Sequence, residues 1–141
     1  MHVFRAMQTV FLGGEVTDMS NTLVLVAAML LVFTAFLHSV LGERRLIGPL
    51  IARREGILAS CLARFVLRFA WHLTSVTWLV LGLILVQLVR DPATARFWAV
   101  AATGVAFSGV GLFDAVASRG RHVGWPLLAG IGVAALLSLL K

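Results

Sequence analysis

Four apolar runs, each long enough to cross a membrane, take up most of the 141-residue chain. A transmembrane helix needs about 20 mostly apolar residues, and helices are expected because an open strand edge cannot satisfy its backbone in lipid. The runs cover residues 22–41, 69–89, 97–117 and 123–140. Only 13% of the residues are charged, against about 25% in a soluble domain. The sequence therefore predicts an all-α integral membrane protein, a four-helix transmembrane bundle that forms a single domain over residues 1–141.

The segments outside the runs are short. Residues 1–20 form an N-terminal extension, and residues 42–68 form a basic connection between the first two runs. Within this connection, apolar residues from 46 to 62 recur at helical spacing with arginines between them, and glycine and proline interrupt the pattern. Such a segment is typical of an amphipathic helix that lies in the membrane interface. We therefore expect a short, broken interfacial helix there.

Arginine placement predicts the orientation. One side of the expected bundle carries eight basic residues and the other carries four. The heavy side holds Arg44, Arg45, Arg53, Arg54, Arg64, Arg68, Arg119 and Arg121, and the light side holds Arg5, Arg90, Arg96 and Lys141. Short loops rich in arginine stay in the cytoplasm, so both termini are expected outside a bacterial-type inner membrane. The net charge of +6 fits anionic lipid headgroups at the span ends rather than nucleic acid.

One ionisable residue lies near the same end of each run. His38 comes three residues before the end of the first run, and Asp114 three before the end of the third. His72 lies near the start of the second run, and His122 directly precedes the fourth. At about 1.5 Å per residue, all four are expected within roughly 5–8 Å of one level. Ionisable residues inside membranes are functional candidates by default, so these four define a candidate site.

The chemistry of that site has several alternatives. Three histidines and a carboxylate suit a divalent metal, although intervals of 34 and 50 residues between the histidines match no compact metal motif. Haem ligated by His38 and His72 is a second alternative. Proton transfer by a histidine–aspartate pair is a third, because histidine titrates near physiological pH. In the purely structural alternative, Asp114 pairs with a neighbouring arginine, and the histidines form hydrogen bonds that hold neighbouring helices together.

Two further sets of residues predict an anionic ligand and close packing of the last two helices. A basic rim favours an anionic ligand such as a lipid headgroup or phosphate; its members are Arg44, Arg45, Arg68 and Arg121. Small residues in the last two runs favour close helix approach; they are Gly104, Gly109, Gly111, Gly130 and Gly132.

Three functions are consistent with this pattern. The leading one is a small polytopic membrane protein whose cytoplasmic-side His/Asp cluster binds a metal or haem, with or without catalysis. The alternative is a non-enzymatic accessory or assembly subunit that contacts a membrane-embedded partner protein in a larger complex. The second alternative is a small oligomeric transporter coupled to protons. The lipid bilayer is the expected partner in all three.

Overall fold

The computed structural model describes the backbone of residues 2–140 and the side chains of residues 19–140. Helices and no strands make up this part of the chain, which confirms the all-α prediction. The α-helices are α1 (His2–Gly42), α2 (Gly48–Ala52), α3 (Cys61–Arg90), α4 (Ala95–Ala117) and α5 (Trp125–Leu137). A π-helical turn, η1 (Glu43–Ile47), joins α1 to α2, and a 3-10 turn, η2 (Gly56–Ala59), precedes α3.

Three helical segments are long and apolar enough to cross a membrane: Met19–Ala52, Cys61–Arg90 and Ala95–Ala117. The fourth run forms only the short apolar helix α5. Its 13 residues extend about 20 Å, whereas the hydrocarbon core is about 30 Å thick. The helix is shorter than the predicted run because residues 118–124 form a loop and the last α-turn ends at Leu137.

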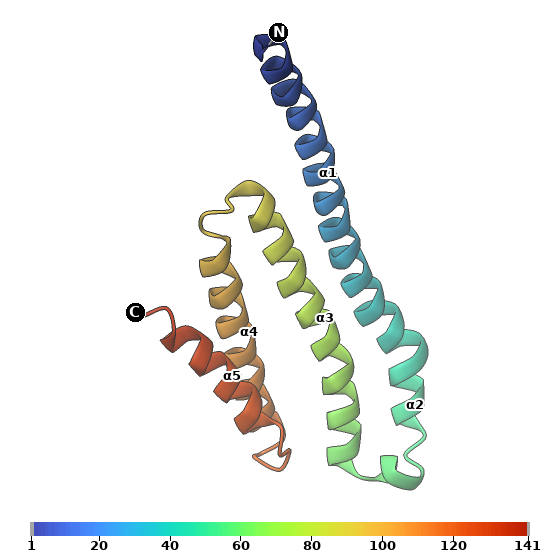
Figure 1. The fold of residues 1–141 in the computed structure, drawn as a ribbon. Coiled ribbons are helices and arrows are strands. Elements are labelled where there is room, and N and C mark those ends of the chain that lie inside the picture. Colours follow the sequence, from blue (N-terminus) through green and yellow to red (C-terminus); the bar gives the residue numbers. More distant parts are fainter. Residues whose placement is uncertain (1, 141) are drawn as a thin grey trace.

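The helices form a row (Figure 1). α3 lies between α1 and α4, and α5 packs on the other side of α4. The closest pairs are α1 with α3 and α4 with α5, and the smaller α3–α4 contact joins them. The loop after α2 and the loop between α4 and α5 lie at the same end of the row (Figure 1), as the predicted topology requires.

The connection between the first two spans differs from the predicted interfacial helix. The first helix does not stop near residue 41 but continues through η1 into α2, as far as Ala52. Pro49 has no N–H to donate and its ring crowds the preceding turn. The wider π-turn directly before α2, closed by the Gly48 N–H on the Glu43 carbonyl, accommodates it. α3 then begins at Cys61, before the predicted residue 69, because the Ser60 hydroxyl caps it.

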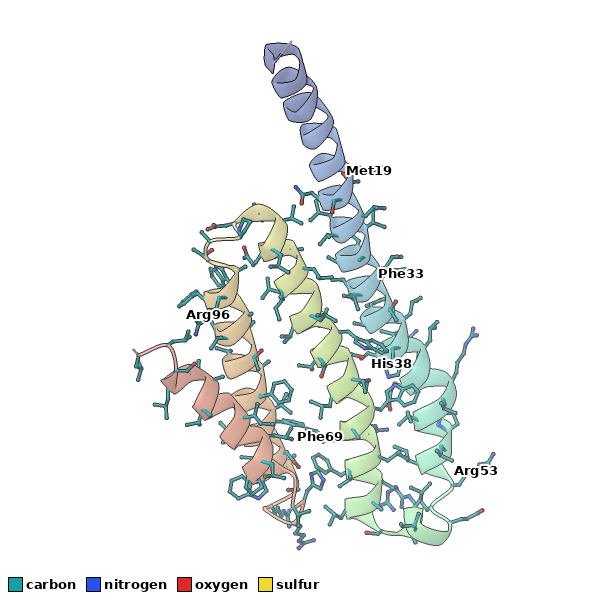
Figure 2. The ribbon with its side chains drawn as sticks, viewed as in Figure 1. Met19, Phe33, His38, Arg53, Phe69 and Arg96 are labelled. Atoms are coloured by element: carbon teal, nitrogen blue, oxygen red, sulfur yellow. The ribbon has the colours of Figure 1, made fainter. Side chains whose placement is uncertain are left out.

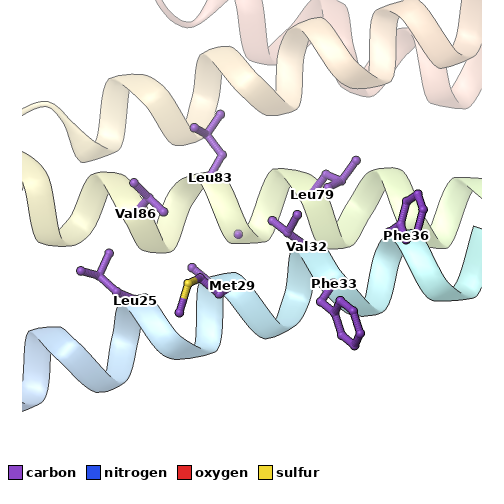
Figure 3. A pocket seen from close by; sticks show the side chains of 10 residues that line it. Leu25, Met29, Val32, Phe33, Phe36, Leu79, Leu83 and Val86 are labelled. Carbon is purple, nitrogen blue, oxygen red and sulfur yellow. The ribbon is translucent and has the colours of Figure 1, made fainter.

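Few apolar side chains are buried. Among residues 19–140 the buried ones are Ala28, Ala35, Ile47, Ile51 and Ala95. Large side chains such as Phe33, 59% exposed, project from the helices instead (Figure 2). An apolar groove of about 830 Å³ follows the α1–α3 seam on either side of Gly82 (Figure 3). So much exposed apolar surface requires lipid or a partner protein to cover it.

Glycines bring α4 and α5 together, which confirms part of the predicted small-residue stripe. A Cβ atom on Gly104 would lie 2.7 Å from the Leu136 side chain, and Cβ atoms on Gly111 and Gly132 would meet the backbone of the facing helix. Gly109 and Gly130 face open space, with no neighbouring atom within 4 Å of an added Cβ. The backbones therefore approach at three of the five predicted positions.

Candidate functional site

A polar network connects α1 and α3 near the end that carries the basic loops. Arg68 Nη2 lies 2.7 Å from Glu43 Oε1, and His72 Nε2 lies 3.4 Å from Glu43 Oε2. His72 Nδ1 lies 3.1 Å from the Ser39 hydroxyl oxygen. That hydroxyl donates to the Ser75 hydroxyl over 2.9 Å. These five residues, which we call the α1–α3 network, surround His72 with a carboxylate on one ring nitrogen and a hydroxyl on the other.

Helical spacing explains how α3 contributes to this network. Steps of three or four residues place side chains on one face of a helix; on α3 the stripe is Arg64, Arg68, His72 and Ser75. The last three contact α1, whereas the Arg64 guanidinium donates to two carbonyls of η2 over 2.7 and 2.8 Å.

Glu43 is the member of the network that the sequence prediction did not identify. In the sequence it lies just beyond the first apolar run, directly before Arg44 and Arg45 of the basic connection. In the structure it is the first residue of η1, one turn beyond Ser39 on a helix that continues past the predicted span end. Its i+4 spacing from Ser39 was the available signal, but that signal counts only if the helix extends to residue 43.

His38 has a different environment from His72. Its ring stacks on Trp71 with centroids 4.1 Å apart and planes 8° apart, and Trp78 meets it edge-on at 4.9 Å. His38 Nε2 lies 3.0 Å from the Thr74 hydroxyl and 3.3 Å from the Trp71 carbonyl oxygen. Since a carbonyl oxygen only accepts, the geometry places a hydrogen on Nε2. The Trp71 indole in turn donates to the His38 carbonyl over 3.1 Å. His38 therefore joins α1 to α3 by stacking and hydrogen bonds.

Asp114 and His122 form a second pair, on the α4 side of α3. His122 Nδ1 lies 2.6 Å from Asp114 Oδ2, and the Asp114 residue is completely buried, with 0% exposed. Its other oxygen, Oδ1, has no hydrogen-bond partner among residues 19–140. The Phe69 ring meets the His122 ring edge-on at 6.0 Å. This buried carboxylate depends on a single histidine for its polar contact through the side chain.

The loop after α4 places His122 over Asp114. The Gly120 N–H donates to the Ala115 carbonyl over 2.8 Å, and Arg119 and Gly120 both have positive φ, 55° and 71°. This hydrogen bond and the two positive φ angles resemble a Schellman motif, which reverses the chain direction at the end of α4. The Ser118 hydroxyl then accepts from the His122 N–H at 3.3 Å. His122, which directly precedes the predicted fourth run, is therefore the direct partner of Asp114.

The four predicted residues do not meet at one site. His38 and His72 lie in the α1–α3 seam with separate partners, and Asp114 and His122 pair with each other. No group of three or more His, Cys, Asp or Glu side chains that could hold a metal occurs in the part of the chain with described side chains. Both imidazoles predicted to ligate haem already have partners from the protein. The predicted metal and haem sites therefore have no support in this geometry.

The predicted basic rim is divided as well. Arg68 pairs with Glu43, whereas Arg44 and Arg45 are exposed on η1. Arg121 lies at the other seam, where it lines a cavity with Arg119. Arg68 also lines a cavity, but it is already paired with Glu43, whereas Arg121 lines its cavity without an ion-pair partner among the described side chains.

The arrangement suits proton transfer. An Asp114 carboxylate that accepts from Nδ1 orients the His122 ring, which is the role that a carboxylate has beside a general base. The Ser39 hydroxyl gives its one hydrogen to Ser75, so towards His72 it can only accept from Nδ1–H, while the His72 Nε2 faces the Glu43 carboxylate. Both His72 and His122 therefore have a carboxylate beside one ring nitrogen.

Searches for related proteins among family models, curated proteins and solved structures found no significant match.

Proposed function

We propose that this chain is a multi-pass protein of a bacterial-type inner membrane whose histidine–carboxylate pairs exchange protons at the cytoplasmic side. The arginine distribution supports the orientation, with both termini outside, because the two loops at the arginine-rich end would face the cytoplasm. Proton coupling in a small oligomeric transporter is one use of such a pair.

The burial of Asp114 carries this proposal. A carboxylate with 0% exposure and one oxygen without a hydrogen-bond partner in the described region is costly to keep charged. A neighbouring imidazole at 2.6 Å offers a second position for the proton. A structural salt bridge would place an arginine there, yet neither Arg119 nor Arg121 forms an ion pair with Asp114.

The two pairs lie close to each other across α3. Phe69 contacts the His122 ring at 6.0 Å and lies one helical turn from His72 on α3. Phe69 and Phe113, with ring centroids 6.3 Å apart, line an apolar cavity of about 290 Å³ that also reaches His72. Apolar walls exclude bulk water and strengthen electrostatic interactions, which favours exchange between the pairs and one side of the membrane.

Charge displacement in a supported membrane tests the proposal without requiring a substrate. A pH jump on adsorbed proteoliposomes should give a transient current as protons bind groups below the surface. We expect Asp114→Asn and His122→Gln each to remove most of the Asp114–His122 component. Asp91→Asn is the matched control, because Asp91 is exposed in the loop between α3 and α4. Equal transients in wild type and Asp114→Asn would contradict the proposal.

A second candidate function, the accessory or assembly subunit, is favoured by the incomplete coverage of the helices. α5 is about 10 Å shorter than the hydrocarbon core, so it crosses only where the bilayer thins or a partner covers its ends, and many large apolar side chains of the described helices are exposed. A membrane-embedded partner protein would cover such faces. Native mass measured directly from membranes tests this, because an obligate partner would appear with the chain at fixed stoichiometry. In that function, Asp114→Asn would reduce recovery of the complex and leave the current transient unchanged.

A further inference from the structure

The seam between α3 and α4 contains a second feature that proton exchange does not use. A cavity of about 270 Å³ opens where α3 begins and α4 ends, and Cys61, Ala117, Arg119 and Arg121 contribute to its lining. Neither guanidinium has an ion-pair or hydrogen-bond partner among the side chains of residues 19–140. The nearest carboxylate along the chain, Asp114, is buried and already paired with His122. The cavity therefore carries uncompensated positive charge.

The mouth of this cavity suits a phosphate group. Two guanidiniums provide planar, multiple N–H donors that match phosphate oxygens. α3 begins beside them at Cys61, so the free N–H groups of its first turn add a positive partial charge. The Ser118 hydroxyl lies in the same wall. Every charged side chain that lines the cavity is positive, and the negative partial charge of the α4 C-terminus, which lies in the same wall, is smaller than the two full guanidinium charges.

The inner end of the seam is apolar. Phe65 lines both this cavity and the adjoining one of about 290 Å³, whose other lining residues are Arg68, Phe69, His72 and Phe113 and whose wall surface is almost entirely apolar. The three phenylalanine rings have centroids 5.7 to 6.3 Å apart and follow the seam away from the arginines. A ligand that fills both cavities has an anionic end at the helix termini and an apolar end deeper between the helices.

We propose that the α3–α4 seam is a binding site for an anionic glycerophospholipid. Its phosphate lies between Arg119 and Arg121, and one acyl chain lies over Phe65 and Phe113. This depth places the headgroup at the level of the helix ends, where lipid phosphates of the cytoplasmic leaflet lie in the predicted topology. A soluble phosphate ester would use only the mouth and leave the phenylalanine seam unfilled.

Cys61, the only cysteine of the chain, is a built-in reporter for this site. We expect a neutral, water-soluble maleimide to alkylate Cys61 severalfold more slowly in nanodiscs that contain phosphatidylglycerol than in nanodiscs of phosphatidylcholine alone. The ratio of the two rates, taken for each variant separately, removes any effect of a substitution on the reactivity of the thiol itself.

Two double variants with the same change in charge separate the site from general attraction. Arg119→Gln with Arg121→Gln should abolish the protection, because each arginine near an anionic surface contributes about fivefold, and two contribute roughly thirtyfold in affinity. Arg53→Gln with Arg54→Gln is the matched control, since both arginines are exposed on the same membrane side in the other loop. The control should keep the protection.

A third variant tests the shape of the site. Ala117 is an exposed residue of the cavity wall, and Ala117→Phe should block entry while it keeps every arginine. Protection should be lost in this variant. Equal loss in both arginine double variants, or full protection in Ala117→Phe, would overturn the proposal. Protection of Cys61 by inorganic phosphate in phosphatidylcholine nanodiscs, to the same extent, would also overturn it in favour of a free phosphate ligand.

Discussion

Close packing of α4 on α5 makes a sharp prediction for Gly132→Ala. A Cβ atom on Gly132 would lie 2.8 Å from the Gly104 carbonyl oxygen, 0.6 Å short of the 3.4 Å at which ordinary van der Waals contact begins. It would also meet the backbone nitrogen and the hydroxyl of Ser108. Backbone atoms cannot rotate away as a flexible side chain can, so the two helices must separate.

The size of the effect follows from that separation. A gap of 0.5–1 Å forfeits about a quarter to a half of the dispersion energy of each contact, and overpacking of this kind typically costs about 1–3 kcal/mol. We therefore expect Gly132→Ala to lower the free energy of unfolding by about 2 kcal/mol. Gly130→Ala, two residues away on α5 but facing open space, should be neutral or slightly stabilising, because alanine favours the helix.

Reversible unfolding in bicelles, followed by steric trapping, measures both variants. The difference between Gly132→Ala and Gly130→Ala is the informative quantity, because both substitutions add the same methyl group to the same helix. Equal stability of the two variants would show that α5 does not pack on α4 through Gly132. The α4–α5 packing, which holds the His122 loop beside Asp114, would then be wrong.

Three other predictions follow from the structure. Gly42→Ala should displace the Trp71 indole, which would lie 2.5 Å from the new Cβ, and lower the free energy of unfolding by about 1–3 kcal/mol. The NMR resonance of the indole N–H should shift in Gly42→Ala and stay unchanged in Gly109→Ala. Glu43→Gln should change stability by less than about 1 kcal/mol, because the Arg68 and His72 side chains are 49% and 39% exposed and solvent screens their ion pairs; a larger loss in the same unfolding assay would contradict this. Reporter fusions after Arg54 and Arg121 should read cytoplasmic, and fusions near Asp91 and after residue 141 external; a cytoplasmic reading after residue 141 alone would mean that α5 does not cross.

Regular features of the fold could be predicted from the sequence. Apolar runs of membrane-spanning length predicted the helices, and the i, i+4, i+7 spacing of Arg68, His72 and Ser75 explains why they share the face of α3 that contacts α1 and η1. Three of the five small residues expected to bring α4 and α5 together do so. These features depend on local periodicity, which the sequence carries directly.

Irregular features could not be predicted in the same way. The first helix was expected to end near residue 41, where the apolar run ends, but a π-turn continues it past Pro49 and positions Glu43. The turn after α4 uses Arg119 in the left-handed region, where glycine is the usual signal. Because the sequence does not reveal this turn, it also does not reveal that His122 pairs with Asp114, eight residues earlier.

Residue depth alone was a poor guide to the site. Equal distance from the predicted span ends does not correspond to equal distance from the helix ends: Asp114 lies three residues before the end of α4, whereas His72 lies eleven residues inside α3 and His38 fourteen residues before Ala52. Depth also could not show which face each residue occupies, and α3 separates the two histidines of the α1–α3 seam from the Asp114–His122 pair. Since each helix also began or ended at a different residue from the one predicted, facing directions required the packed structure.

Solid-state NMR of the Asp114–His122 pair in bilayers tests the central claim most directly. With aspartate carboxyl carbons and histidine ring nitrogens labelled, we predict that Nδ1 of His122 lies within direct hydrogen-bonding reach of the Asp114 carboxylate, about 2.6–3.2 Å from an oxygen. As the pH is varied, the two signals should change together, because one proton is shared between them. A His122 ring that titrates while the Asp114 carboxyl signal stays constant would contradict proton exchange by this pair.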